Sequence, residues 1–297
     1  MHKHSFKHWL GTAAMAASLT FGAMGSAQAA DDTIEFGWTA WSDAEFITKL
    51  AKQVIEEHTD YNVKLTLSAI GVQYQGVANG DLDAMLMAWL PDTHADYYDK
   101  FENDVENLGT LYEDARLGWV VPSYVPEDQL ASISDLKKPG IADKLSGKIQ
   151  GIDPGAGLMQ LSNKTMDAYG LGDSYRLVSA SGAAMTAALS RAYDNKDWIV
   201  VTGWTPHWMF ARWDLKYLDD PKKSFGEAEH INTVVHNGLE ERMPEAYAIL
   251  DNFHWTPDQM GEVMLMNQED DSDPYENAKE WVAENQDVVQ QWLPDAE

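Results

Sequence analysis

Residues 194–208 read Asp-Asn-Lys-Asp-Trp-Ile-Val-Val-Thr-Gly-Trp-Thr-Pro-His-Trp. A polar turn leads into the apolar strand pattern at 198–202. A Trp-x-Pro segment follows, and proline cannot continue a central strand. The same order occurs earlier, where the turn Asn79-Gly-Asp81 precedes the buried strand pattern at 84–88 and then Trp89-Leu-Pro91. A helical pattern comes before each turn. The recurrence predicts two α/β lobes of similar plan, each with a tryptophan just past a strand.

The surrounding segments alternate between strand and helix patterns. The first lobe has strand patterns at 33–38 and 63–67 and helix patterns at 44–58 and 72–78. Ser42 or Asp43 is expected to cap the helix at 44–58. The second lobe has strand patterns at 148–152 and 175–179, and helices at 183–193 and from Leu158 onward. Alternation of this kind predicts an α/β fold, in which ligands bind beyond the carboxyl ends of the strands.

The chain is expected to cross between the lobes twice. One crossing is the segment 117–122, where Pro122 ends a strand, and the other lies near 231–235. The tail then returns to the first lobe with helices at 244–253, 257–266 and 275–292. We therefore expect a signal peptide at 1–29, a first lobe at 30–121 plus 231–297, and a second lobe at 122–230.

The amino terminus has the three regions of a secretory signal. Lys3 and Lys7 give a basic start, residues 9–24 are apolar and rich in Ala, and Ser26-Ala-Gln-Ala-Ala30 offers cleavage after Ala29. No other stretch is long enough to span a bilayer. The chain has no Cys, which excludes thiol chemistry, Cys-ligated zinc and a lipid anchor on an amino-terminal Cys. These features predict a periplasmic protein without a membrane anchor.

The acidic side chains outnumber the basic ones, and the formal net charge is -27. Such a surface repels nucleic acids and anionic membranes. The acids are scattered along the chain, which fits either general solubility or adaptation to a saline habitat.

An enzymatic function finds little support in the motifs. The chain contains no G-x-S-x-G, no H-E-x-x-H and no Walker loop. His94 and His207 lack a second ligand at a recognisable spacing, so no metal site and no cofactor are expected. A secreted hydrolase remains a remote alternative.

The twelve tryptophans carry the strongest functional signal. Trp41, Trp89 and Trp204 share one position, just past a strand and beside a turn or a proline. Three indoles converging from two lobes would form an electron-rich box that attracts a quaternary ammonium group. The glycine turn at 153–158 opens a helix, whose free N–H groups can bind a carboxylate or a phosphate. Packing roles are expected for the tryptophans in apolar strands or helices, which are Trp119, Trp198, Trp281 and Trp292.

Five segments resemble the glycine betaine-binding proteins of ABC importers for osmoprotectants. They are Gly37-Trp-Thr-Ala-Trp-Ser-Asp43, Ala88-Trp-Leu-Pro-Asp-Thr-His94, Gly151-Ile-Asp-Pro-Gly-Ala-Gly-Leu-Met159, Ser181-Gly-Ala-Ala-Met-Thr-Ala-Ala-Leu189 and Val201-Thr-Gly-Trp-Thr-Pro-His-Trp-Met-Phe210. The resemblance implies a two-lobed periplasmic binding protein of the type II kind, with two α/β sandwich lobes and a two-crossing hinge. It also implies that the protein is a receptor for a small solute and acts with a membrane permease.

The resemblance assigns roles to six residues. Trp41, Trp89 and Trp204 would form the cage for the trimethylammonium group. The backbone N–H groups of Gly157 and Leu158 would bind the carboxylate, with His94 as a side-chain donor from the facing lobe. Trp38 also lies in the first motif, and we prefer Trp41 because it sits deeper in the loop.

Trp208 and His207 follow Trp204 closely in the sequence. A short helix after Pro206 would turn the Trp208 ring away from the cleft. We therefore expect Trp208 and His207 to pack behind the cage.

The sequence thus predicts a monomeric receptor for glycine betaine or a close quaternary-ammonium carboxylate. A receptor for choline, carnitine or dimethylsulfoniopropionate remains an alternative, although choline lacks the carboxylate that the donors would bind. A receptor that stacks sugars or peptides on Trp would need more polar side chains than the cage segments offer.

Overall fold

The structure is a computed structural model that describes residues 32–269 and 272–294. The predicted signal peptide lies outside the described residues. Within them, no helix is both long and apolar enough to cross a membrane.

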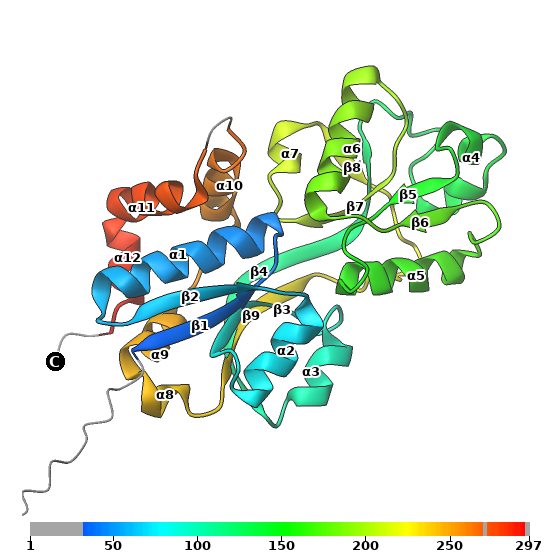
Figure 1. The fold of residues 1–297 in the computed structure, drawn as a ribbon. Coiled ribbons are helices and arrows are strands. Elements are labelled where there is room, and N and C mark those ends of the chain that lie inside the picture. Colours follow the sequence, from blue (N-terminus) through cyan, green and yellow to red (C-terminus); the bar gives the residue numbers. More distant parts are fainter. Residues whose placement is uncertain (1–31, 270–271, 295–297) are drawn as a thin grey trace, which may run out of the picture. The chain divides into compact units, whose positions relative to one another are not determined.

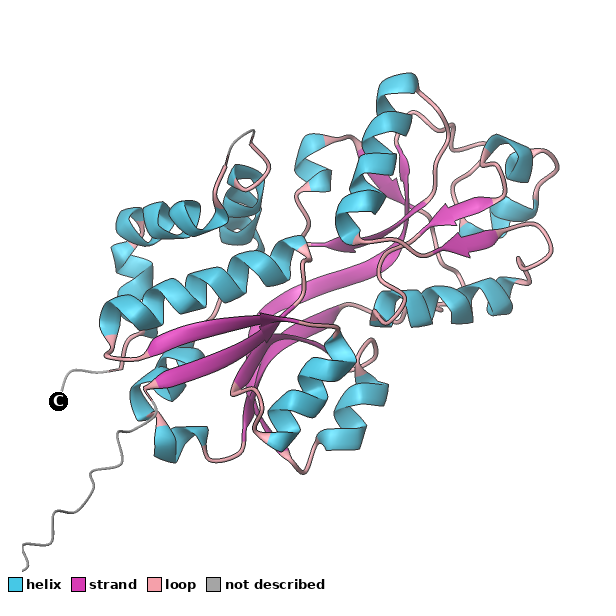
Figure 2. Cartoon of the chain, viewed as in Figure 1, coloured by secondary structure: helices cyan, strands magenta, loops and turns pink. Residues whose placement is uncertain are grey.

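Strands and helices alternate through the first 200 residues of the described chain, and helices dominate the tail (Figures 1 and 2). The strands are β1 (Thr33–Trp38), β2 (Asn62–Leu67), β3 (Ala84–Leu90), β4 (Val105–Pro122), β5 (Lys148–Gln150), β6 (Arg176–Val178), β7 (Val201–Thr205), β8 (Leu215–Tyr217) and β9 (Glu229–His236). The helices are α1 (Ser42–His58), α2 (Ile70–Asn79), α3 (Ala95–Phe101), the 3₁₀ helix η1 (Ile133–Lys137), α4 (Ile141–Lys144), α5 (Gly157–Tyr169), α6 (Gly182–Asn195), α7 (Met209–Arg212), α8 (Leu239–Arg242), α9 (Pro244–Asn252), α10 (Pro257–Met266), α11 (Pro274–Glu284) and α12 (Gln286–Trp292).

The strands form one hydrogen-bonded network in the order β2-β1-β3-β9-β4-β7-β5-β6, with β8 also paired to β4. Pairing is parallel among β1, β2 and β3 and among β5, β6 and β7, and β9 and β4 run antiparallel to their neighbours. Each parallel group is a strand–helix–strand arrangement, so the carboxyl ends of its strands meet at one edge.

The long strand β4 joins the two parallel groups. It pairs with β9 up to Ala115 and with β7 from Arg116 onward, and β9 begins at Glu229. We call residues 32–115 and 229–294 the first half and residues 116–228 the second half. The pairing partner of β4 therefore changes between Ala115 and Arg116, before the lobe boundary at 121 that the sequence suggested, and β4 continues as one strand through this point. The division into lobes at 121/122 and 230/231 stays a prediction.

Helices cover the sheets on both sides in each half (Figure 1). In the first half, α1 packs against β2 and β3 and is covered in turn by α10 and α11, while α2 contacts β1 and β9. The tail is held by an aromatic cluster of Trp255, Trp281 and Trp292. The Trp255 ring also meets Phe46 of α1, with a centroid separation of 5.2 Å. The tail therefore packs onto the half that holds β1 to β3.

Three local predictions need correction. The single helix expected at 275–292 is two helices, because the chain leaves helical geometry at Asn285 (φ -118°, ψ 39°). The strand expected at 198–202 is β7, which begins at Val201 and includes Trp204, whereas Trp198 lies before it. Neither Ser42 nor Asp43 caps α1, since the N-cap is Trp41 and no side chain caps it.

Candidate functional site

One cavity is lined by all six residues that the sequence singled out. Trp41, Trp89, His94, Gly157, Leu158 and Trp204 surround it together with Thr93, Leu117, Ile152 and Ala156. The space among them, including the part that opens to solvent, is about 280 Å³. The cavity is therefore suited to a small solute.

Both halves supply the walls of the cavity. Trp41 lies at the N-cap of α1 and Trp89 near the end of β3, whereas Trp204 lies near the end of β7. Leu117 of β4 is the register partner of Trp204, which explains its place beside that ring. Both Trp-x-Pro segments contain a cis peptide bond, at Leu90–Pro91 and Thr205–Pro206. The repeated sequence pattern thus has a repeated backbone form.

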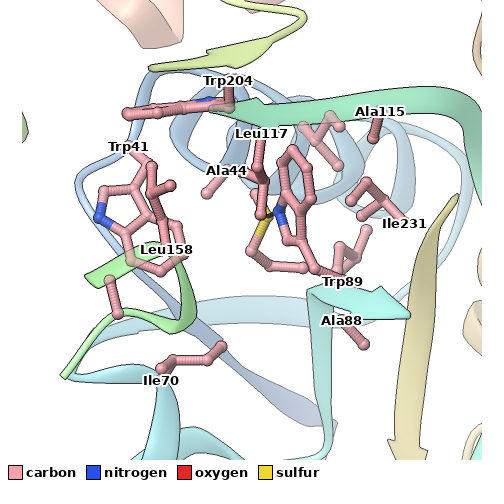
Figure 3. Packing of buried hydrophobic residues seen from close by; sticks show 14 of the residues in the cluster. Trp41, Ala44, Ile70, Ala88, Trp89, Ala115, Leu117, Leu158, Trp204 and Ile231 are labelled. Atoms are coloured by element: carbon pink, nitrogen blue, oxygen red, sulfur yellow. Dashed lines mark hydrogen bonds between the residues drawn. The ribbon is translucent and has the colours of Figure 1, made fainter. Parts of the chain in front are cut away.

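The three indole rings face a common space (Figure 3). All three are at least nine-tenths buried. Each indole N–H is already bonded: Trp41 Nε1 to Asp153 Oδ2 at 3.1 Å, Trp89 Nε1 to Met87 Sδ at 3.2 Å, and Trp204 Nε1 to Asp43 Oδ1 at 3.0 Å. Because the N–H groups are taken, the rings offer the cavity carbon and π-electrons. This wall can attract a cation but cannot donate to an anion.

His94, which also lines the cavity, has a ring N–H without a partner among the described residues. The His94 Nδ1 accepts the backbone N–H of Trp89 at 3.1 Å, which places the proton of the neutral ring on Nε2. Burial lowers the pKa of His94 to about 3, and a backbone contact at Met87 offsets only part of this shift, so the ring is neutral at physiological pH. Among the described residues, Nε2 has no partner. A buried N–H without a protein partner is available to an acceptor in the cavity.

The start of α5 adds two backbone donors. The N-cap residue Ala156 has no side-chain acceptor, and no described residue accepts a bond from the N–H of Gly157 or Leu158. The first N–H groups of a helix attract anions. Gly157 also lies tightly against the first half, because a Cβ there would be 2.4 Å from the Thr93 carbonyl oxygen. Only glycine lets α5 approach His94 this closely.

Comparisons with known proteins agree on one family. The family model described as the substrate-binding domain of ABC-type glycine betaine transport systems matches residues 32–284. The chain belongs to this family.

A curated relative is the glycine betaine/carnitine transport binding protein GbuC of Listeria monocytogenes, 47% identical over 161 residues. The match covers 54% of this chain and 53% of GbuC, so the chain spans about half the length of that relative.

Two solved structures are similar over nearly their whole length. Lactococcal OpuAC, closed and complexed with glycine betaine, is 40% identical with a TM-score of 0.81, covering 88% of this chain and 99% of that one. An ABC-transporter choline-binding protein in complex with choline is 26% identical with a TM-score of 0.80, covering 88% and 91%. The predicted fold, a two-lobed periplasmic binding protein of mixed α/β type, is confirmed.

Three aromatic residues that lie close to Trp41 or Trp204 in the sequence do not line the cavity. They are Trp38, His207 and Trp208. Trp38 is not among the lining residues, and its ring lies 5.3 Å from the Lys49 Nζ. His207 packs edge-on against Trp204 with a centroid separation of 4.4 Å, and Trp208 packs between His207 and Trp213. Burial lowers the pKa of His207 to about 3, and its Nδ1 accepts the N–H of Met209. These placements match the expected packing behind Trp204.

Sequence reasoning missed the side chains that hold the cavity walls in place. Asp43 was expected to cap a helix, yet its carboxylate is fully buried and accepts bonds from Trp204 and Tyr112. Glu229 of β9 is also buried and accepts the backbone N–H groups of Asp92 and Thr93 at 2.6 and 2.8 Å. Their partners are distant in sequence, so no local motif marks them. Within the described chain, no cluster of three or more His, Asp or Glu side chains could hold a metal ion.

Proposed function

We propose that this protein captures glycine betaine in the cavity between its halves. The observation that carries the proposal is that the cavity is lined by two kinds of group. Three indole rings can attract a cation, and free N–H donors on His94, Gly157 and Leu158 can bind an anion. Glycine betaine is a small zwitterion with a trimethylammonium group at one end and a carboxylate at the other. Its trimethylammonium group would lie against the indoles, and its carboxylate would accept hydrogen bonds from the three N–H groups.

The magnitudes allow useful affinity. Each indole face contributes about 1–2 kcal/mol to binding a desolvated cation. Each charge-assisted hydrogen bond contributes about 1.5–3 kcal/mol. After the cost of association, a micromolar Kd, near -8 kcal/mol, is within reach.

We further propose that the protein works in the periplasm and delivers its ligand, as a monomer, to the membrane permease of an ABC importer. The family model supports a substrate-binding role in transport, which is an extracytoplasmic role. Membership of this family supports a binding component of a transporter over the alternative of a hydrolase.

Calorimetric titration with glycine betaine tests the proposal. We expect a single saturable site with a Kd in the micromolar range. Absence of both heat and a thermal shift with every methylammonium compound tried would refute it.

Choline and carnitine are the second candidates. The choline complex of a structural relative and the carnitine in the name of GbuC favour their inclusion. Choline cannot use the three free donors as a carboxylate does, so we expect it to bind more weakly than glycine betaine. A competition series of betaines, carnitine, choline, ectoine and proline measures this order.

A further inference from the structure

Two indoles of the cavity donate hydrogen bonds across the boundary between the halves. Trp41, in the first half, donates to Asp153 in the second half at 3.1 Å. Trp204, in the second half, donates to Asp43 in the first half at 3.0 Å. The two bonds run in opposite directions. Because each joins opposite halves, both must break when the halves separate.

The carboxylate of Asp43 has no cationic partner. It has no exposed surface, and none of the ion pairs among the described residues includes it. Its second oxygen accepts the hydroxyl of Tyr112 at 2.9 Å, and Tyr112 belongs to β4. The carboxylate also lies in the first turn of α1, where backbone N–H groups favour an anion. A buried carboxylate without a cation is costly unless a positive charge comes near it.

The charge lies at the N–H edge of an indole that lines the cavity. An anion that accepts the indole N–H of Trp204 makes that ring more electron-rich, and Trp204 is one of the residues that line the cavity. A cation in the cavity would therefore be attracted both by the ring and by the carboxylate at its edge. Asp153 holds the same relation to Trp41 from a partly exposed position.

We propose that Asp43 and Asp153 are positioning residues that complete the cage only when the halves meet and that supply negative charge at the N–H edges of two of its indole walls. The inference rests on the proposed function. It makes closure and the recognition of a cation a single event, because the same indoles form the cage and the bonds between the halves. It also predicts that the cavity distinguishes a cation from a neutral group of the same shape.

The test compares glycine betaine with 3,3-dimethylbutanoate, in which a carbon atom replaces the charged nitrogen. Asp43→Asn keeps an oxygen that can accept the Trp204 N–H but removes the charge. We expect it to weaken glycine betaine binding by about tenfold or more while changing 3,3-dimethylbutanoate binding by less than about twofold. Asp153→Asn should show the same pattern with a smaller loss, since Asp153 is partly exposed.

A control variant removes a bond between the halves without touching the cage. The Tyr97 hydroxyl of α3 donates to the Gly155 carbonyl at 2.9 Å and accepts from Gln160 at 3.0 Å. Tyr97→Phe should therefore weaken the binding of both ligands by the same factor. Both affinities are measured by calorimetry or by competition against glycine betaine, with far-ultraviolet circular dichroism as the check on folding.

The outcomes separate this inference from the proposed function. If the wild-type protein does not bind glycine betaine, the proposed function fails. If it binds and Asp43→Asn lowers the two affinities equally, or changes neither, the charge at the edge of the indole has no role and the inference is wrong. If 3,3-dimethylbutanoate binds the wild-type protein as tightly as glycine betaine does, the inference is also wrong.

Discussion

The contact at Gly157 makes the sharpest prediction about how the two halves meet. Gly157 is the first residue of α5, and a Cβ there would lie 2.4 Å from the carbonyl oxygen and 2.5 Å from the Cγ2 of Thr93. Contacts between unbonded carbon and oxygen normally exceed about 3 Å, and the carbonyl belongs to backbone that Glu229 holds in place. Gly157→Ala should therefore prevent the halves from approaching fully.

Forcing an extra methyl group into a packed site costs about 1–3 kcal/mol. In a binding equilibrium this corresponds to about a 5- to 150-fold rise in Kd for glycine betaine. Stability should not fall, because alanine is the better helix former and Gly157 does not need a positive φ. The assay is calorimetric titration together with thermal unfolding of the free protein.

Gly155 offers the matched control. It lies two residues away, and a Cβ there would meet nothing within 4 Å. Gly155→Ala should bind glycine betaine as the wild-type protein does. If Gly157→Ala binds within twofold of Gly155→Ala, the halves do not close against Gly157 and the reasoning is refuted.

Three further predictions concern the cavity and its buried charge. Trp204→Ala should raise the Kd for glycine betaine at least about tenfold, with an unchanged circular dichroism spectrum, because it removes one cation–π wall; an unchanged Kd would remove Trp204 from the site. His94→Ala should weaken glycine betaine by about 10- to 150-fold but choline only slightly, since only the carboxylate uses the free Nε2–H; equal losses in a competition series would argue against this donor. Burial raises the pKa of Asp43 from 3.8 to about 6, so its ionised form costs the folded protein up to about 3 kcal/mol above pH 6, and this cost disappears as the pH falls towards 4. Urea unfolding should therefore show Asp43→Asn more stable than wild type at pH 7.5, with an advantage that shrinks towards pH 4; an advantage independent of pH would contradict the assignment.

The cost of the ionised Asp43 carboxylate to folding stability bears on the role that we propose for it beside the cavity. Desolvation is the largest influence on this carboxyl and raises its pKa, while the hydrogen bonds from Tyr112 and Trp204 oppose the shift. The folded state therefore binds a proton more readily than the unfolded chain between the two pKa values. A group that costs stability at neutral pH is a candidate for a functional role, because structure alone would favour an uncharged side chain there.

Local patterns were sufficient to predict most elements and the three tryptophans of the cavity, whereas His94 and the backbone donors of Gly157 and Leu158 came from the family resemblance. The apolar spacing at Phe46, Leu50 and Val54 predicted α1, which the structure extends by only two residues at its start. The Trp-x-Pro segments predicted two tryptophans at the cavity because proline ends each strand at the sheet edge. The break between α11 and α12 had no comparable signal, since Asn285 is compatible with a helix interior as well as with its end.

The sequence by itself determined the α/β alternation, the repeated tryptophan position and the glycine turn before α5, because each depends on residues adjacent in the chain. Only the tertiary structure decided which carboxylates accept the indole N–H groups. Asp43 and Trp204 are separated by 161 positions, and Trp41 and Asp153 by 112. Contacts over such separations leave no periodicity or spacing to detect, and they form only when β4 and β9 bring the two halves together. Asp43 therefore resembled a helix cap in the sequence, but in the fold it is a buried charge bonded to the N–H edge of Trp204.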